Sequence, residues 1–78
     1  MEYEKEITAI LLVIEKNDGA TVDDICNVCK TNQTRAKFYI EEAQREGLIQ
    51  YNYVLSTGPT HYYATHEGRR LLIDKGLA

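Results

Sequence analysis

Residues 25–49 are the stretch that most constrains what this chain can fold into. They read ICNVCKTNQTRAKFYIEEAQREGLI. A short helical pattern leads into a polar turn at Lys30 and Thr31, and a longer helical pattern follows Asn32, a residue type suited to cap a helix N-terminus. Gly47 then closes the second helix. The stretch therefore predicts two helices joined by a tight turn, which is a helix-turn-helix.

The length of the chain, 78 residues, predicts a single domain over 1–78. A domain this small has a thin core and often gains stability from a disulfide, a metal or a second subunit. No segment has the length of a transmembrane span. The apolar run 7–14 follows Glu2, Glu4 and Glu6, whereas a signal peptide begins with basic residues. We therefore expect an intracellular, cytoplasmic protein without a membrane role.

The first helix is expected over residues 2–17. One face of it is apolar at helical spacing, and this face consists of Tyr3, Ile7, Ile10, Leu11 and Ile14. Leu12 and Val13 add apolar surface beside that face, and Gly19 is expected in the left-handed conformation that ends the helix. A helix that is apolar nearly all round is usually buried on more than one side. In so small a domain this predicts contact with a second subunit.

The remaining elements follow from caps, apolar spacing and turn residues. They are a short edge strand at 20–22, helices at 22–29 and 33–46, strands at 48–55 and 61–65, and a last helix at 66–75. Thr21, Asn32 and Thr65 are placed to cap the last three helices, and 56–60 is the turn of a hairpin. The order predicts an α+β, mainly α fold: a three-helix core, a β-wing of two or three strands and a short C-terminal helix.

Two stretches make the chain resemble a known family. The first is 25–49, and the second is 62–72, YYATHEGRRLL, in which an aromatic strand is followed by Thr-x-x-Gly and a leucine-bearing helix. The chain resembles the small winged helix-turn-helix regulators of archaea and archaeal viruses. The resemblance implies a DNA-binding transcriptional regulator that acts on double-stranded DNA as a homodimer, with the second helix of the pair in the major groove.

The distribution of charge matters more than its sum. The formal net charge is -3 and the pI is about 5.3, which disfavours binding to a polyanion. From Ile25 to Ile40, however, there is no acidic residue, while Lys30, Arg35 and Lys37 are present. The locally basic segment thus coincides with the helix that the resemblance assigns to the DNA groove.

The residues expected to bind DNA lie in the turn, on the first turns of the second helix and at the hairpin tip. They are Lys30, Asn32, Gln33, Thr34, Arg35, Lys37, Phe38, Thr57 and Thr60. Gln33 is suited to adenine, and Arg35 or Lys37 to guanine or a phosphate. The alternative is that these residues form a solvated helix face. Phe38 is expected on the outward face, against a thymine methyl or a partner, or else folded back under the wing or beside Tyr39.

The homodimer contact is expected to use surplus apolar residues of the first and last helices. They are Leu12, Val13, Leu72, Ile73 and Leu77. A second hypothesis is a winged-helix module that binds another protein and not DNA. The net negative charge and a hairpin tip without lysine or arginine favour this alternative.

Cys26 and Cys29 form a C-x-x-C within a predicted helix, with His61 and His66 much later in the chain. Buried thiols are the favoured interpretation, because these positions suit small apolar residues and the gap before the histidines is longer than in compact zinc fingers. Zinc, a redox pair and a disulfide are the alternatives. No motif for catalysis, a cofactor or a small-molecule substrate is evident, so we expect neither an enzyme nor a metal or cofactor site.

Overall fold

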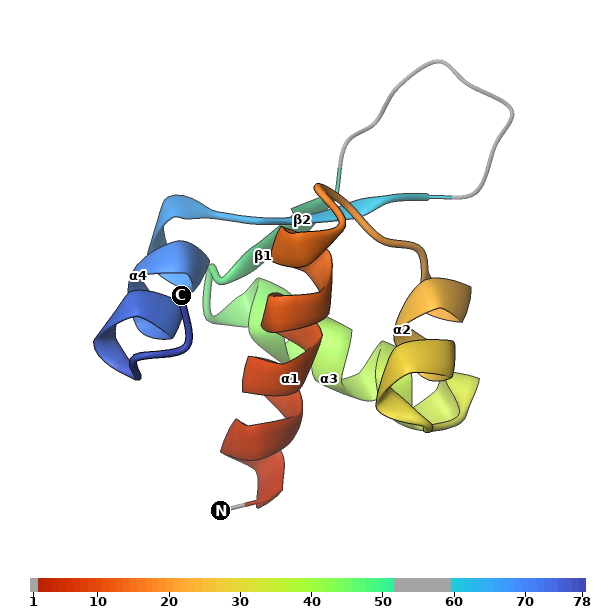
Figure 1. The fold of residues 1–78 in the computed structure, drawn as a ribbon. Helices are drawn as coiled ribbons and strands as arrows, with labels where there is room; N and C mark the ends of the chain where they lie inside the picture. Colours follow the sequence, from red (N-terminus) through yellow and green to blue (C-terminus); the bar gives the residue numbers. More distant parts are fainter. Residues whose placement is uncertain (1, 52–59) are drawn as a thin grey trace.

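The computed structural model describes residues 2–51 and 60–78. Within them it shows a small, mainly helical α+β domain with four helices and one antiparallel pair of strands (Figure 1). The elements are α1 (Glu2–Lys16), α2 (Val22–Cys29), α3 (Gln33–Arg45), β1 (Ile49–Tyr51), β2 (Tyr62–Ala64) and α4 (His66–Asp74). This is the expected order of elements, and it is compatible with a winged helix.

Helix α1 lies at the centre of the fold. In Figure 1 it runs in front of α3, with α2 on one side and α4 on the other. It contacts all three of these helices and β2. The core consists of its inward side chains and apolar residues from every other element: Ile7, Ile10, Leu11, Val13, Ile14, Ala20, Ile25, Ala36, Ile40, Ala43, Ile49, Ala64 and Leu72. The chain thus has one core, built around one helix.

The three helix caps expected from the sequence are confirmed. Thr21 Oγ1 accepts from the backbone N–H of Asp24 at 3.2 Å, and the Asp24 carboxylate accepts from the Thr21 N–H at 3.1 Å, which completes a capping box. Asn32 Oδ1 accepts from the N–H three residues later at 2.9 Å. Thr65 Oγ1 accepts from Gly68 N–H at 3.1 Å. These bonds fix where α2, α3 and α4 begin.

The turn after α1 differs in detail from the sequence-based expectation. Asp18 takes the left-handed conformation with φ of 52°, and Gly19 follows with φ of 111°. Aspartate tolerates this region because its short side chain can bond locally. The edge strand predicted at 20–22 is a single bridge in which Ala20 pairs with Tyr62 through two backbone hydrogen bonds. It ends there because the next residues begin the cap of α2.

The observed elements are slightly shorter than predicted. Helices α1, α3 and α4 each end one residue early, as helix ends commonly do. The described strands pair Ile49 with Ala64, Gln50 with Tyr63 and Tyr51 with Tyr62. Residues 52–55, predicted as strand, and most of the hairpin turn lie outside the described residues.

Two of the residues expected at a subunit contact are in the core. Val13 is 8% exposed and Leu72 is fully buried, so neither is available to a second subunit. The expectation failed because α1 packs against three helices and a strand, which covers more of its circumference than one apolar stripe implies. Leu12 is partly buried, whereas Ile73 and Leu77 are 62% and 45% exposed. The surplus apolar surface is therefore confined to these three residues of the original five.

A backbone contact joins the start of α4 to the turn before β1. The Leu48 carbonyl accepts from Thr65 N–H at 3.0 Å, and the Thr65 hydroxyl donates to the Gly47 carbonyl. Gly68 is buried against the same Leu48 carbonyl, and a Cβ at this position would overlap that oxygen. In the Thr-x-x-Gly motif of the sequence, the threonine thus caps α4 and the glycine allows the helix to lie close to the Leu48 carbonyl.

We expect Gly68→Ala to destabilise the domain by about 1–3 kcal/mol, the range for overpacking a tight site. Helix propensity alone predicts the opposite sign, since alanine is favoured over glycine by about 1 kcal/mol in a helix. Urea unfolding followed by circular dichroism measures the difference.

The matched control is Gly47→Ala. Gly47 has φ of 74°, and a Cβ at this position would meet no heavy atom within 4 Å, so this change adds only backbone strain of about 1 kcal/mol. A Gly68→Ala protein as stable as the wild type would contradict the close-approach argument.

Candidate nucleic-acid interface

Helices α2 and α3 form the helix-turn-helix that the sequence predicts. Lys30 takes a left-handed conformation with φ of 52°, and the N–H groups of Lys30 and Thr31 both donate to the Cys26 carbonyl. These bonds end α2 in the manner of a Schellman-type cap. Asn32 then caps α3 within two residues. The turn is tight because each of its residues has a role in ending one helix or starting the next.

The outward face of α3 carries most of the expected DNA-binding residues. Ala36, Ile40 and Ala43 point into the core. The side chains of Gln33, Thr34, Arg35, Lys37 and Phe38 are exposed on the rest of the helix surface. The structure thus gathers five of the nine expected residues on the first two turns of one helix. Asn32 has a different role, because its side-chain oxygen is already engaged as the cap.

Lys30, Arg35 and Lys37 differ from Arg69 and Lys75 in their partners. Lys30, Arg35 and Lys37 are exposed and make no ion pair with any residue the structure describes. By contrast, Arg69 pairs with Glu15 at 3.1 Å, and Lys75 with Glu4 at 2.6 Å. Helix α4 also lies across α1 from α2 (Figure 1). Lys30, Arg35 and Lys37 are therefore open to an external anion, as are Lys5, Lys16 and Arg70, which are also exposed and make no ion pair among the described residues.

A groove of 260 Å³ runs between α2, α3 and the end of the hairpin. It is lined by Thr21, Val22, Asp23, Gln33, Lys37, Thr60 and Tyr62. It brings Gln33 and Lys37 to Thr60, so residues from the helix and from the hairpin that were expected to bind DNA share one surface. Thr57, expected there too, lies outside the described residues.

The groove also contains a residue that sequence reasoning missed. Gln33 Nε2 donates to Asp23 Oδ1 at 3.0 Å, between exposed side chains ten residues apart. Asp23 precedes the acid-free segment, and nothing in the sequence marks it as a neighbour of α3. The available signal for Asp23 was the N-capping motif at Thr21. This motif fixes the start of α2 at Val22 and so places Asp23 in the first turn of that helix.

Phe38 lies on the outward face and beside Tyr39, while its contact with DNA or a partner stays a prediction. Its side chain is 53% exposed, and its ring meets that of Tyr39 edge to face with centroids 5.3 Å apart. An aromatic edge contact of this kind holds the exposed ring in a defined position. Val28 on α2, 59% exposed, is a second large apolar residue open to solvent.

Cys26 and Cys29 are free thiols, each half-buried against the core. Burial, with smaller contributions from Glu6 and Cys26, raises the pKa of the Cys29 thiol. Among residues 2–51 and 60–78, no three His, Cys, Asp or Glu side chains gather as a metal site. Their packing fits the interpretation of these cysteines as small core residues.

We expect Cys29 to be alkylated by iodoacetamide more slowly in the folded protein at pH 8 than in the unfolded chain. Burial limits access, and the raised pKa lowers the fraction of reactive thiolate. A Cys26→Ser variant isolates the signal of Cys29, and mass spectrometry follows the reaction with and without denaturant. Equal rates in both states would contradict the packing described above.

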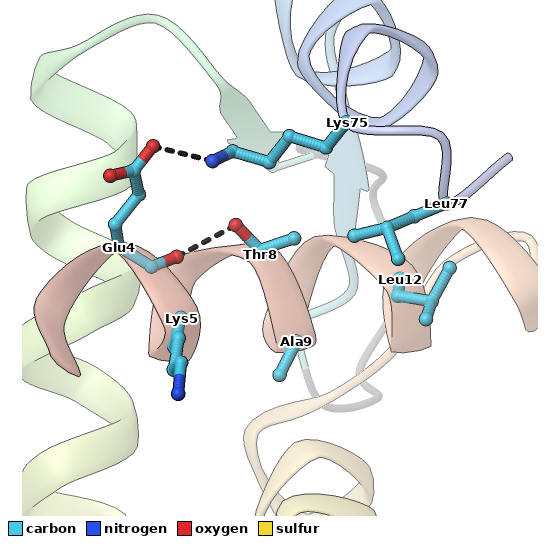
Figure 2. Close-up of a pocket in the computed structure, with 7 residues that line it drawn as sticks. All are labelled: Glu4, Lys5, Thr8, Ala9, Leu12, Lys75 and Leu77. Carbon is cyan, nitrogen blue, oxygen red and sulfur yellow. Dashed lines mark hydrogen bonds and ion pairs between the residues drawn. The ribbon is translucent and has the colours of Figure 1, made fainter. Parts of the chain in front are cut away.

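A larger hollow of 620 Å³ lies between α1 and the C-terminal end of the chain (Figure 2). Leu77 stands next to Leu12 there, and Lys75 reaches across to Glu4. The Lys75 ammonium, by hydrogen bond and charge, lowers the pKa of the Glu4 carboxyl. The hollow thus has apolar side chains at one end and an ion pair at the other.

No protein-family model matches the chain, and no curated protein matches it. None of the helices in the described residues is long and apolar enough to cross a membrane.

Proposed function

We propose that this chain is a winged helix-turn-helix DNA-binding regulator that inserts α3 into the major groove of double-stranded DNA. One observation carries the proposal: the first two turns of α3 present exposed Gln33, Thr34, Arg35 and Lys37 and contain no acidic residue. A major groove about 12 Å wide admits a helix in this way. The capped turn and the alanine-lined inner face hold α3 rigidly enough to act as a reading element.

The hairpin supports the same proposal by its position. Thr60, which lies two residues before β2, shares a groove with Gln33 and Lys37. A protein placed with α3 in the groove therefore brings this end of the hairpin toward the neighbouring phosphates. A threonine hydroxyl donates to phosphate without charge, so the wing contributes position and little electrostatic attraction.

The charge of the protein predicts the character of the binding. With a net charge of -3, the molecule gains little from long-range attraction, and affinity depends on the few cations that meet phosphates directly. We therefore propose modest affinity with a shallow salt dependence set by Lys30, Arg35 and Lys37.

We expect Arg35→Glu combined with Lys37→Glu to reduce duplex DNA binding by about 100-fold or more, since contacts of this kind contribute roughly 1–3 kcal/mol each. Gel retardation and fluorescence anisotropy at low ionic strength measure the loss. Circular dichroism checks that the variant stays folded.

Lys5→Glu combined with Arg70→Glu is the matched control. It changes the net charge by the same amount at two exposed sites on α1 and α4, and because Lys5 lines the hollow of Figure 2, Lys16→Glu combined with Arg70→Glu repeats the control away from that surface; we expect the latter pair to retain most of the binding. Equal loss in the α3 variant and in this pair would show that bulk charge is responsible and not α3. Wild-type protein that binds no duplex in a salt-sensitive way would refute the proposed function.

We further propose that the protein acts as a homodimer on a roughly palindromic site. Leu77 and the partly buried Leu12 line the hollow of Figure 2, and Ile73 is exposed on α4. A two-fold contact through these three residues would pair this surface with its own copy, and two α3 helices then meet successive major grooves about 34 Å apart.

Ile73→Glu combined with Leu77→Glu is expected to give a monomer at micromolar concentration, because each buried charge opposes the contact. Sedimentation equilibrium measures the mass. Val28→Glu, an equally exposed change on α2, is the control that should remain dimeric. A monomeric wild-type protein under the same conditions would exclude the homodimer.

A winged-helix module that binds another protein is the second candidate. The exposed Phe38 and Val28 favour it, because large exposed apolar side chains often mark protein contacts. It predicts that Phe38→Ala abolishes function in the host while purified protein shows no DNA retardation. The regulator proposal predicts retardation in the wild type.

A further inference from the structure

Asp23 and Gln33 connect the two helices of the helix-turn-helix by a side-chain hydrogen bond of 3.0 Å. Asp23 is not required to cap α2, because Thr21 and Asp24 already form the capping box. Its carboxylate is exposed and lies in the groove that also contains Lys37. An acidic side chain at this place repels phosphates, so it opposes general affinity for DNA.

The chemistry of the bond fixes the orientation of the Gln33 amide. An ionised carboxylate only accepts hydrogen bonds, so it must meet the NH₂ group of Gln33 and not its carbonyl oxygen. Nε2 uses one of its two N–H groups on Asp23. The second N–H and the Oε1 acceptor remain for an external partner. An amide rotated by half a turn would place oxygen against oxygen and is excluded.

This remaining pair of groups has the pattern that complements adenine. In the major groove adenine presents N6–H as a donor and N7 as an acceptor, and a glutamine amide pairs with both through its oxygen and its N–H. Holding the amide in advance also reduces the rotamer freedom that the long glutamine side chain loses on binding. Guanine, with two acceptors on this edge, does not match the Oε1 of the held amide.

We propose that Asp23 is a positioning residue for base recognition: it holds the Gln33 amide in the orientation that reads adenine. This rests on the proposed function and adds to it a residue outside α3 that sets specificity. Asp23 lowers affinity for all sequences through its charge and raises the preference for an A·T pair at one position.

The experiment is selection from a random duplex pool, followed by anisotropy titrations on the selected site and on the same site with G·C at the position assigned to Gln33. The proteins are the wild type, Gln33→Ala, Asp23→Ala, Asp23→Asn and the double alanine variant. We expect the wild type to prefer A·T at that position by about tenfold or more. Gln33→Ala should lose this preference, and Asp23→Ala should lose most of it.

Two further comparisons separate positioning from charge. The double alanine variant should lose no more preference than Gln33→Ala alone, because Asp23 acts through Gln33. Asp23→Asn should recover part of the preference, since its carbonyl oxygen can still accept from the Gln33 amide. Glu41→Ala, which removes an exposed acid from α3 without contact to Gln33, should change affinity for both sites alike. Thermal melting confirms that each variant is folded.

The outcomes distinguish the two proposals. Binding by the wild type with an A·T preference that Asp23→Ala leaves intact would overturn the positioning role and leave DNA binding standing. Equal gains in affinity for both sites on removing Asp23 would also overturn the positioning role, because they indicate charge repulsion alone. Wild-type binding without any base preference would overturn it as well. Absence of salt-sensitive binding in the wild type would overturn the proposed function and this inference with it.

Discussion

The arrangement of this domain depends on the contacts that the Leu48 carbonyl oxygen makes with the start of α4. It accepts from Thr65 N–H and lies against Gly68, which joins the turn after α3 to the start of α4. The bond sits at the end of the β1–β2 register, where Ile49 pairs with Ala64. Because α3, the hairpin and α4 all meet at this point, a change there alters the angle between the helix proposed to read DNA and the hairpin beside it.

Local patterns were sufficient to predict the order of elements and the three caps. Thr21, Asn32 and Thr65 each bond the backbone a few residues away, so their signal is contained in a short stretch of sequence. Contacts between distant residues were not predictable in this way. Arg69 meets Glu15 across 54 positions, and spacing within either helix does not indicate the other. The burial of Leu72 was missed for the same reason, since it depends on how α4 docks on α1.

For the candidate site, too, the sequence predicted features local to one helix and not the contacts between helices. Helical geometry places Thr34 and Phe38 opposite Ala36 and Ile40, and burial in the structure agrees. The sequence did not indicate which residues of other elements lie next to those side chains. Asp23 lies ten residues before Gln33, and only the docking of α2 on α3 brings the acid to the amide.

The acid beside the α3 face is the feature that bears most on function. A module built only for affinity to phosphates would not place a carboxylate in the groove that contains Lys37 and Thr60. On the proposed DNA-binding function, an acid there limits binding to unspecific DNA, because each unspecific duplex would meet the same repulsion while only the correct base would gain the held amide. With a net charge of -3, the proposed discrimination then comes from low background binding as much as from strong binding to one site.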